Sequence, residues 1–294
     1  MNNLNVLAID LAKNVFQLCK LSPQGKVVFN REFSRQKLKE LLVKEKPSLV
    51  AMEACSSSHY WARFAEDAGH QVKVINARVV KGFQTKQKTD KNDALAIGVA
   101  APLEHIKGIR VLSVEEQGLQ SLERARQLAV EQKTALSNQL RGLLSEFGII
   151  IPQGIAALRK HIPLILEDAE NSLPDNFRHT LFRMWQMLLF QLEQIELLQN
   201  QVEKEVKHHH VCKKLIALEG VGPIAALGLA VRLGAGDNFA SGRDASASIG
   251  LTPKQHSSGG KEKIGHISKR SADKRLRSIL FQGALAVVSR ELRH

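Results

Sequence analysis

Two short apolar runs that each end on an acidic residue constrain the fold of this chain most strongly. The run NVLAID ends at Asp10, and the run LVAME ends at Glu53. Apolar runs of this length between polar residues are typical of buried strands, so each acid is expected at the tip of a strand. A further pair, Asp90 and Asp93, lies on a predicted helix, where residues three apart are neighbours on one face. The sequence therefore predicts an α/β fold that gathers four carboxylates.

The first 110 residues alternate between predicted strands and helices. Strands are expected at residues 5–10, 15–21, 26–33, 49–53 and 71–76, and helices at 36–46, 60–68 and 90–101. A Pro-Gln-Gly turn signal at residues 23–25 makes the first three strands an expected antiparallel meander. The resulting order, β-β-β-α-β-α-β-α, is that of ribonuclease H-like nucleases. Residues 1–110 are predicted to form such an acid-bearing domain.

The rest of the chain is predicted to be mainly helical. A seam at coiled-coil spacing runs from Leu119 to Phe147, and a second apolar run from Leu181 to Val202. Residues 111–208 are therefore expected to form an all-α coiled-coil hairpin, within one chain or between two. Residues 209–294 are expected to form a third domain, mainly α.

The predicted C-terminal domain carries two phosphate-binding signals. The segment LEGVGP places Gly220 and Gly222 in a helix-hairpin-helix-like turn, whose glycines let backbone amides approach a phosphate; the same pattern also occurs in plain tight turns. Residues 254–277 hold eight lysines and arginines against two acids. These basic residues are candidate phosphate contacts or a solvated helix face: Lys254, Lys261, Lys263, Lys269, Arg270, Lys274, Arg275 and Arg277.

Composition agrees with a polyanionic partner in a reducing compartment. The 294 residues carry a formal net charge of +13, which favours nucleic acid as the partner. The three cysteines lack metal-ligand spacing and suit free buried thiols. Neither a signal peptide nor a membrane span is expected, so the expected location is the cytoplasm.

The four acids predict metal-assisted chemistry on phosphodiesters. Clustered carboxylates repel one another when desolvated, and a cation relieves that repulsion. Hard oxygen ligands suit Mg²⁺ or Mn²⁺ better than zinc. Three lysines close to the acids in sequence would either hold substrate phosphates or balance charge: Lys13, Lys88 and Lys91.

Residues 252–260, rich in serine and glycine, are expected to form a flexible loop. A serine there could attack phosphorus as a covalent nucleophile, although loops of this kind are more often phosphate-contacting turns.

Seven segments together resemble one known family over nearly the whole chain. They are AIDLAKNVF, MEACSSSHYW, INARVVKGF, KTDKNDA, LEGVGPIAA, IGLTPKQHSSGGK and GHISKRSADKRLR. The chain resembles the DEDD-type insertion-sequence transposases of family one-ten, its eleven-eleven branch in particular, which are related to the Piv invertase.

This resemblance implies a bridge-RNA-guided serine recombinase. Asp10, Glu53, Asp90 and Asp93 would hold Mg²⁺ in a RuvC-like N-terminal domain, and the spacing of the family motif places the nucleophilic serine at Ser258. A phosphoserine linkage to DNA would conserve the energy of the broken bond. The implied partners are donor and target DNA, a structured bridge RNA and further copies of the chain, as a homodimer assembling into a tetramer at the nucleoid.

Two other functions stay open from the residues alone. A metal-dependent RuvC-like junction nuclease would use the four acids and water, without need of Ser258. A non-catalytic nucleic-acid-binding protein would tolerate substitution of Asp10 and Glu53.

Overall fold

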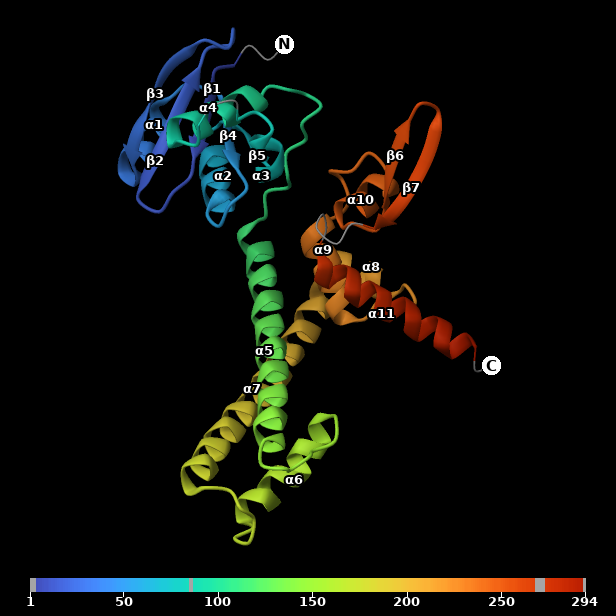
Figure 1. The fold of residues 1–294 in the computed structure, drawn as a ribbon. Coiled ribbons are helices and arrows are strands. Elements are labelled where there is room, and N and C mark those ends of the chain that lie inside the picture. Colours follow the sequence, from blue (N-terminus) through green and yellow to red (C-terminus); the bar gives the residue numbers. More distant parts are fainter. Residues whose placement is uncertain (1–3, 85–86, 268–272, 293–294) are drawn as a thin grey trace. The chain divides into compact units, whose positions relative to one another are not determined.

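A computed structural model describes residues 4–84, 87–267 and 273–292 of the chain (Figure 1). The chain divides into two compact units, Met1–Val114 and Glu115–His294. The predicted subdivision of the second unit at residue 209 stays a prediction, as does the exact boundary at residue 110. Lys269 and Arg270 lie outside the described residues.

The first unit is built on a five-stranded sheet in the order β3-β2-β1-β4-β5. The strands are β1 (Val6–Asp10), β2 (Val15–Leu21), β3 (Val27–Ser34), β4 (Leu49–Glu53) and β5 (Gln71–Ile75). The first three pair antiparallel, as the predicted meander requires, and β4 runs parallel to both β1 and β5. The predicted order is confirmed, with one additional short helix, α3 (Ala77–Lys81).

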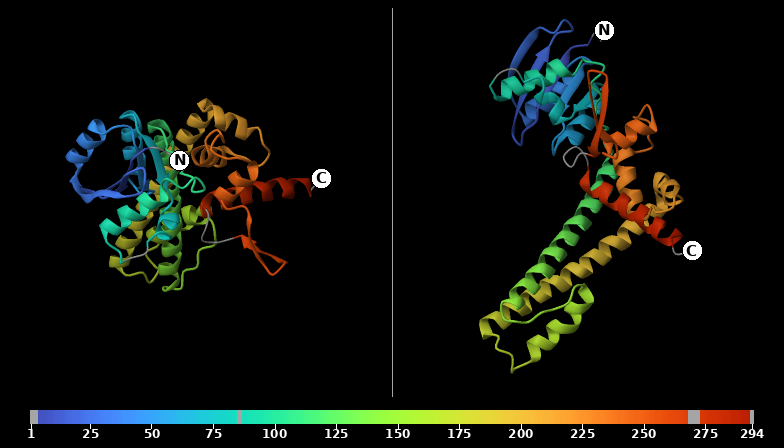
Figure 2. Two further views of the ribbon diagram at one scale, coloured as in Figure 1. Left: turned by 90° about the horizontal axis from the view of Figure 1, so that it is seen from above. Right: turned by 45° about the vertical axis from the view of Figure 1, so that its right-hand side comes forward.

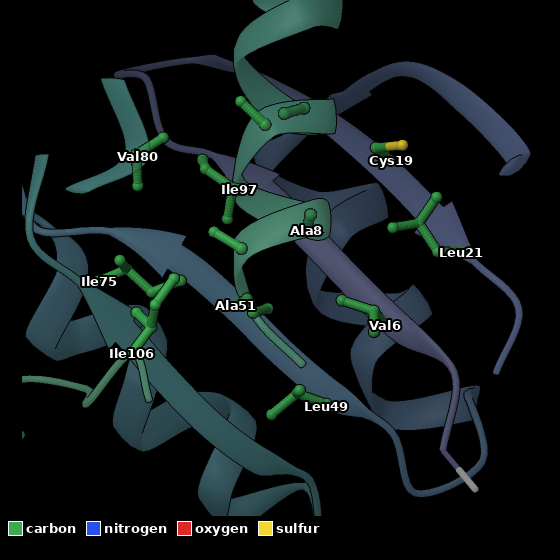
Figure 3. Close-up of a cluster of buried hydrophobic side chains, with 14 residues drawn as sticks. Val6, Ala8, Cys19, Leu21, Leu49, Ala51, Ile75, Val80, Ile97 and Ile106 are labelled. Atoms are coloured by element: carbon green, nitrogen blue, oxygen red, sulfur yellow. The ribbon is translucent and has the colours of Figure 1, made fainter. Parts of the chain in front are cut away.

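Both faces of this sheet are covered by helices. Alternate strand residues such as Leu7 and Ile9 pack against α1 (Arg35–Lys44) and α2 (Ser58–Asp67), around buried Trp61. Their neighbours Val6 and Ala8 pack on the opposite face, against α4 (Asp90–Ala100) (Figure 3). Because β1 and β4 are buried on both sides, they read as continuous apolar runs in the sequence.

The second unit contains two long antiparallel helices, α5 (Val114–Ser145) and α7 (Asp175–His208), which lie side by side in the views of Figures 1 and 2. The end of α5, at Leu140 and Leu144, packs with the start of α7, at Leu181 and Trp185. Further along, Arg126 Nε donates to Gln199 Oε1 at 2.8 Å. The helical hairpin is therefore present within one chain, whereas its coiled-coil geometry stays a prediction.

The segment between the long helices contains a further helix. Residues 155–167 form α6 (Ile155–Glu167), with Pro163 inside it. Buried Leu158 and Ile162 belong to the same apolar cluster as Leu140 of the predicted seam and Leu144 beside the seam. Leu140 is thus buried by contacts within one chain, without pairing of two chains.

The remainder of the second unit is mainly helical, as predicted. It contains α8 (His210–Ile216), α9 (Pro223–Leu233), α10 (Gly242–Ser248) and α11 (Lys274–Glu291). The predicted flexible loop at residues 252–260 is wrong, because most of it belongs to an antiparallel hairpin of β6 (Pro253–Ser258) and β7 (Lys261–Ile267). Among the described residues, none of the helices is long and apolar enough to cross a membrane.

Candidate active site

Asp10 and Glu53 lie at the same edge of the first unit's sheet. They are the last residues of β1 and β4, which are parallel neighbours with Ile9 opposite Met52. Side chains alternate between the faces of a strand, so Asp10 shares a face with Ala8, and Glu53 shares it with Ala51. That face is the one covered by α4. The two acids therefore end the α4 face of adjacent strands.

The first turn of α4 brings two more acids to this edge. Thr89 caps the helix by accepting a hydrogen bond from Asn92 N at 3.3 Å. Asp93 lies on the same helical stripe as buried Ala94 and Ile97, which pack on the sheet. The stripe directs Asp93 towards the ends of β1 and β4.

A glycine on α4 allows the helix to lie close to the sheet. A Cβ atom added at Gly98 would lie 2.7 Å from Leu21 Cδ1 and 3.2 Å from Ala8 Cβ. A larger residue would require the Leu21 side chain to move or α4 to shift away from β1. Small side chains here thus set the depth at which the carboxylates of the first turn meet the strand ends.

Asp10 and Glu53 both have raised pKa values, and neighbouring acids contribute to each. Burial raises the pKa of Asp10 from 3.8 to about 6, with further contributions from Asp93, Asp90 and Glu53, while Lys88 lowers it. The pKa of Glu53 is also raised, first by burial and then by Asp93, and is lowered by Lys88. The structure therefore brings the four predicted acids and Lys88 into one electrostatic cluster.

Polar residues that the sequence analysis did not identify hold the acidic turn in place. Gln84 Nε2 donates to Asp93 Oδ1 at 2.8 Å. Buried Gln17, opposite Asp10 in the sheet, donates to Asn30 Oδ1 at 2.6 Å, and Asn30 Nδ2 donates to the Lys91 carbonyl at 2.8 Å. The signal for Gln17 was available, since it is a polar residue inside an apolar strand pattern.

The donor chemistry of this cluster fits a hard divalent cation. Carboxylate oxygens are the preferred ligands of Mg²⁺ and Mn²⁺, and such an ion would relieve the repulsion that contributes to the raised pKa values of Asp10 and Glu53. Within the described ranges, however, no three His, Cys, Asp or Glu side chains lie together closely enough to hold a metal ion.

All three predicted lysines of this unit, Lys88 included, lie on its surface. Lys13 and Lys91 are exposed. Their backbone carbonyls accept hydrogen bonds, that of Lys13 from Arg35 Nη2 at 3.5 Å and that of Lys91 from Asn30. Of the three lysines, Lys88 is the one whose charge lowers the pKa values of Asp10 and Glu53.

Ser258 is the last residue of β6 and lies beside a tight turn. Gly259 and Gly260 have φ values of 58° and 75°, the left-handed backbone of a two-residue type I′ turn. Ser258 pairs with Lys261, and Ser257 pairs with Glu262. Both serines are exposed, but neighbouring strand residues point to opposite faces. The hairpin therefore has a Ser258 face and a Ser257 face with different neighbours.

One of the two glycines of the predicted phosphate-binding turn has a packing role. Gly220 has a φ of 77°, and a Cβ there would lie 2.9 Å from the Gly283 carbonyl oxygen of α11. A side chain at Gly220 would force the turn and α11 apart. Gly222 caps α9 in extended conformation, and a Cβ added there would meet open space. Close packing against α11 is sufficient to explain why residue 220 is a glycine.

The predicted basic contacts occupy different environments. Lys254, Lys261 and Lys263 are exposed on the hairpin, and Lys274 is exposed at the start of α11. Arg277 donates to the Gly250 carbonyl at 3.5 Å. The guanidinium of Arg275 instead pairs with Glu123 of α5 at 3.2 Å, with the two side chains 21% and 14% exposed. Arg275 is therefore better described as a packing residue than as a phosphate contact.

Replacing Arg275 by alanine is expected to destabilise the protein by about 2 kcal/mol, because it leaves the Glu123 carboxylate largely buried without its partner. Lys274→Ala, at the exposed neighbouring position, should change stability by less than about 0.5 kcal/mol. Urea unfolding of both variants measures the difference. Equal stability of the two variants would show that the Glu123 pair contributes nothing.

Comparison with known proteins gives matches along nearly the whole chain. A family profile described as a transposase matches residues 7–149, and the profile of the transposase IS116/IS110/IS902 family matches residues 212–294. A probable family 20 transposase of Pseudomonas aeruginosa is 38% identical over 97% of this chain and 85% of its own length. The transposase for insertion sequence element IS1328 of Yersinia enterocolitica is 36% identical over 99% and 86%. The transposase for element IS1111A of Coxiella burnetii is 34% identical over 98% and 79%.

Proposed function

This chain belongs to the IS110/IS116 family of DEDD transposases, and from that premise we propose that it cuts and rejoins DNA through a phosphoserine intermediate on Ser258. The observation that carries the catalytic part is the shared electrostatics of Asp10, Glu53, Asp90 and Asp93. Burial and three neighbouring acids raise the pKa of the half-buried Asp10 carboxyl; this arrangement costs stability, and such arrangements cluster at functional sites.

The acids are proposed to hold Mg²⁺, or Mn²⁺ in its place. When bound, the ion would help to activate a nucleophile and stabilise a leaving oxygen. Lys88 lies close enough to Asp10 and Glu53 to lower the pKa of both. Its ammonium group can balance the acids in the resting protein and contact a phosphate oxygen of bound DNA.

Ser258 is proposed to supply the nucleophilic hydroxyl. Its Oγ forms a bond to phosphorus, the bond from phosphorus to a deoxyribose oxygen breaks, and that oxygen leaves as a hydroxyl group. Attack by a new DNA hydroxyl reverses the step and releases Ser258. The number of phosphoester bonds is conserved, so joining needs no nucleotide cofactor.

The proposed partners are donor and target DNA with a structured bridge RNA. The formal net charge of +13 supports binding to phosphate backbones. Sequence choice would come from RNA–DNA pairing rather than from protein contacts to bases. A homodimer assembling into a tetramer is proposed to bring two DNA segments together.

A reconstituted recombination assay tests this function. Purified protein is mixed with DNA carrying the element ends, target DNA, Mg²⁺ and RNA transcribed from the flanking non-coding segment. Joined DNA is expected with the full mixture, and its yield should fall to background when RNA or Mg²⁺ is omitted. Freely hydrolysed ends without joining would instead indicate a RuvC-like nuclease, and DNA binding without any cleavage would indicate a binding protein.

A further inference from the structure

The β6–β7 hairpin separates two sets of side chains by face. Cross-strand partners share a face, and alternate residues of a strand share it too. The register pairs Ser258 with Lys261 and His256 with Lys263. One face therefore carries His256, Ser258, Lys261 and Lys263, here called the Ser258 face.

The opposite face has a different character. Its members are Gln255, Ser257, Glu262 and Ile264. Gln255 Nε2 donates to the Ser257 hydroxyl at 3.4 Å. This face has one acid and no lysine among the four, whereas the Ser258 face has two lysines, so a phosphate is attracted to the Ser258 face.

From this arrangement we propose that His256 accepts the proton that Ser258 loses when its hydroxyl attacks DNA. His256 is the alternate neighbour of Ser258 on the same strand face, about 7 Å away along the backbone, a separation that two side chains can bridge. A serine hydroxyl is a weak nucleophile unless a base lies beside it, and a neutral imidazole is the commonest such base. The proposal rests on the proposed role of Ser258 as the nucleophile.

The lysines complete the reacting arrangement. Lys261 lies directly across from Ser258, where paired side chains are about 5 Å apart at Cβ, and Lys263 lies across from His256. Their ammonium groups would hold the non-bridging oxygens of the phosphate over the serine. The proton passes from Ser258 Oγ to an imidazole nitrogen, and the Oγ–phosphorus bond forms as the bond to the deoxyribose oxygen breaks on the opposite side of phosphorus. The leaving oxygen takes a proton from water, and the imidazolium returns its proton to the resulting hydroxide. The imidazole is then neutral, and all atoms and charges balance.

Exposure of the hairpin makes this proposal open to a chemical-rescue test. All six residues of β6 are exposed, so added imidazole can reach the space left by His256→Ala. The assay follows the covalent protein–DNA adduct on a suicide DNA substrate with RNA and Mg²⁺. His256→Ala is expected to form the adduct about 10²–10⁴-fold more slowly than the wild type, with DNA binding unchanged, and added imidazole should restore part of the rate.

His266→Ala is the matched control, because His266 lies on β7 towards the end of the hairpin away from Ser258. It should form the adduct at the wild-type rate and respond little to imidazole. A wild-type rate in His256→Ala, a slow rate that imidazole does not raise, or a loss explained by weaker DNA binding would each overturn the role of His256 while leaving Ser258 as the nucleophile. Absence of an adduct in the wild-type protein would instead overturn the proposed function itself.

Discussion

Replacing Asp10 by asparagine is expected to abolish DNA recombination and, at the same time, to make the metal-free protein more resistant to heat. Both effects have one cause. Asp10 is a half-buried carboxyl whose pKa is raised to about 6 by burial and by Asp93, Asp90 and Glu53. Asparagine keeps the shape of the side chain but removes the charge, and with it both the repulsion and a proposed metal ligand.

The direction of the pH dependence follows from the raised pKa. The folded protein holds the Asp10 proton more tightly than the unfolded chain, so this contribution to stability is fully present below pH 3.8 and is lost as the pH rises through about 6. Above that pH, the metal-free wild-type protein carries the full repulsion. The stability difference between Asp10→Asn and the wild type should therefore grow between about pH 4 and pH 7.

Thermal unfolding in EDTA and in Mg²⁺ measures these effects alongside the recombination assay. Mg²⁺ should raise the Tm of the wild type by binding the folded state, and should leave Asp10→Asn nearly unchanged. Asp67→Asn, an exposed acid at the end of α2, is the control and should recombine DNA normally. A variant at Asp10 that keeps the Mg²⁺ shift or the wild-type recombination rate would show that this carboxylate is no metal ligand.

The sheet and its acids could be predicted because strands that are buried on both faces appear as continuous apolar runs in the sequence. β1 and β4 are covered on both faces, so their apolar runs and the acids that end them stand out from the sequence. The capped first turn of α4 is equally visible, through Thr89 and the pair Asp90 and Asp93. The sequence did not reveal the hydrogen bond that holds this turn, which Gln84 donates to Asp93, nine residues further along the chain.

The β6–β7 hairpin is hidden in the sequence for the opposite reason. Both of its faces are exposed, so its residues follow no apolar alternation, and the segment KQHSSGGK reads as a polar loop. The signal that remains is the glycine pair at residues 259–260, which is typical of a two-residue hairpin turn. In α6, Pro163 reads as a helix breaker, although the apolar contacts of Leu158 and Ile162 outweigh the lost backbone hydrogen bond.

The glycine at position 220 is compatible with two roles, phosphate binding and close backbone packing. A glycine in a turn between helices suits both a phosphate approach and a close backbone contact. Only the structure reveals Gly283 of α11 against it, because that neighbour is distant in sequence. Likewise Arg275, one basic residue among eight, could be separated from the others only by its contact with Glu123.

Replacing Ser258 by alanine is expected to remove both DNA cleavage and the covalent protein–DNA adduct, with a loss of at least about 10⁴-fold in rate. Ser257→Ala, one position away, should slow cleavage only a few-fold. Both serines are exposed and both carry a hydroxyl group. Comparing the two variants therefore tests which face of the β6–β7 hairpin carries the nucleophile. DNA binding should survive in both variants, since neither substitution removes a charge.

The hairpin register gives the physical reason for this difference. A phosphate placed over Ser258 meets Lys261 beside it, whereas a phosphate placed over Ser257 meets the carboxylate of Glu262. At a surface separation of about 4 Å, each such charge contributes from about 1 to about 4 kcal/mol, depending on how much water is excluded. Attraction on one face and repulsion on the other therefore favour attack by Ser258, independently of the family motif.

Trapping the adduct on a suicide substrate and mapping the modified peptide by mass spectrometry decides between the serines. Ser258 and Ser257 share one peptide, so the fragment ions must separate the two positions, and the alanine variants provide the check. A phosphate found on Ser257 would mean that the hairpin presents its other face to DNA, and Glu262→Gln should then speed the reaction. Efficient cleavage by Ser258→Ala, with hydrolysed ends and no adduct, would mean that water is the nucleophile and that the carboxylates at the ends of β1 and β4 act without the hairpin serine.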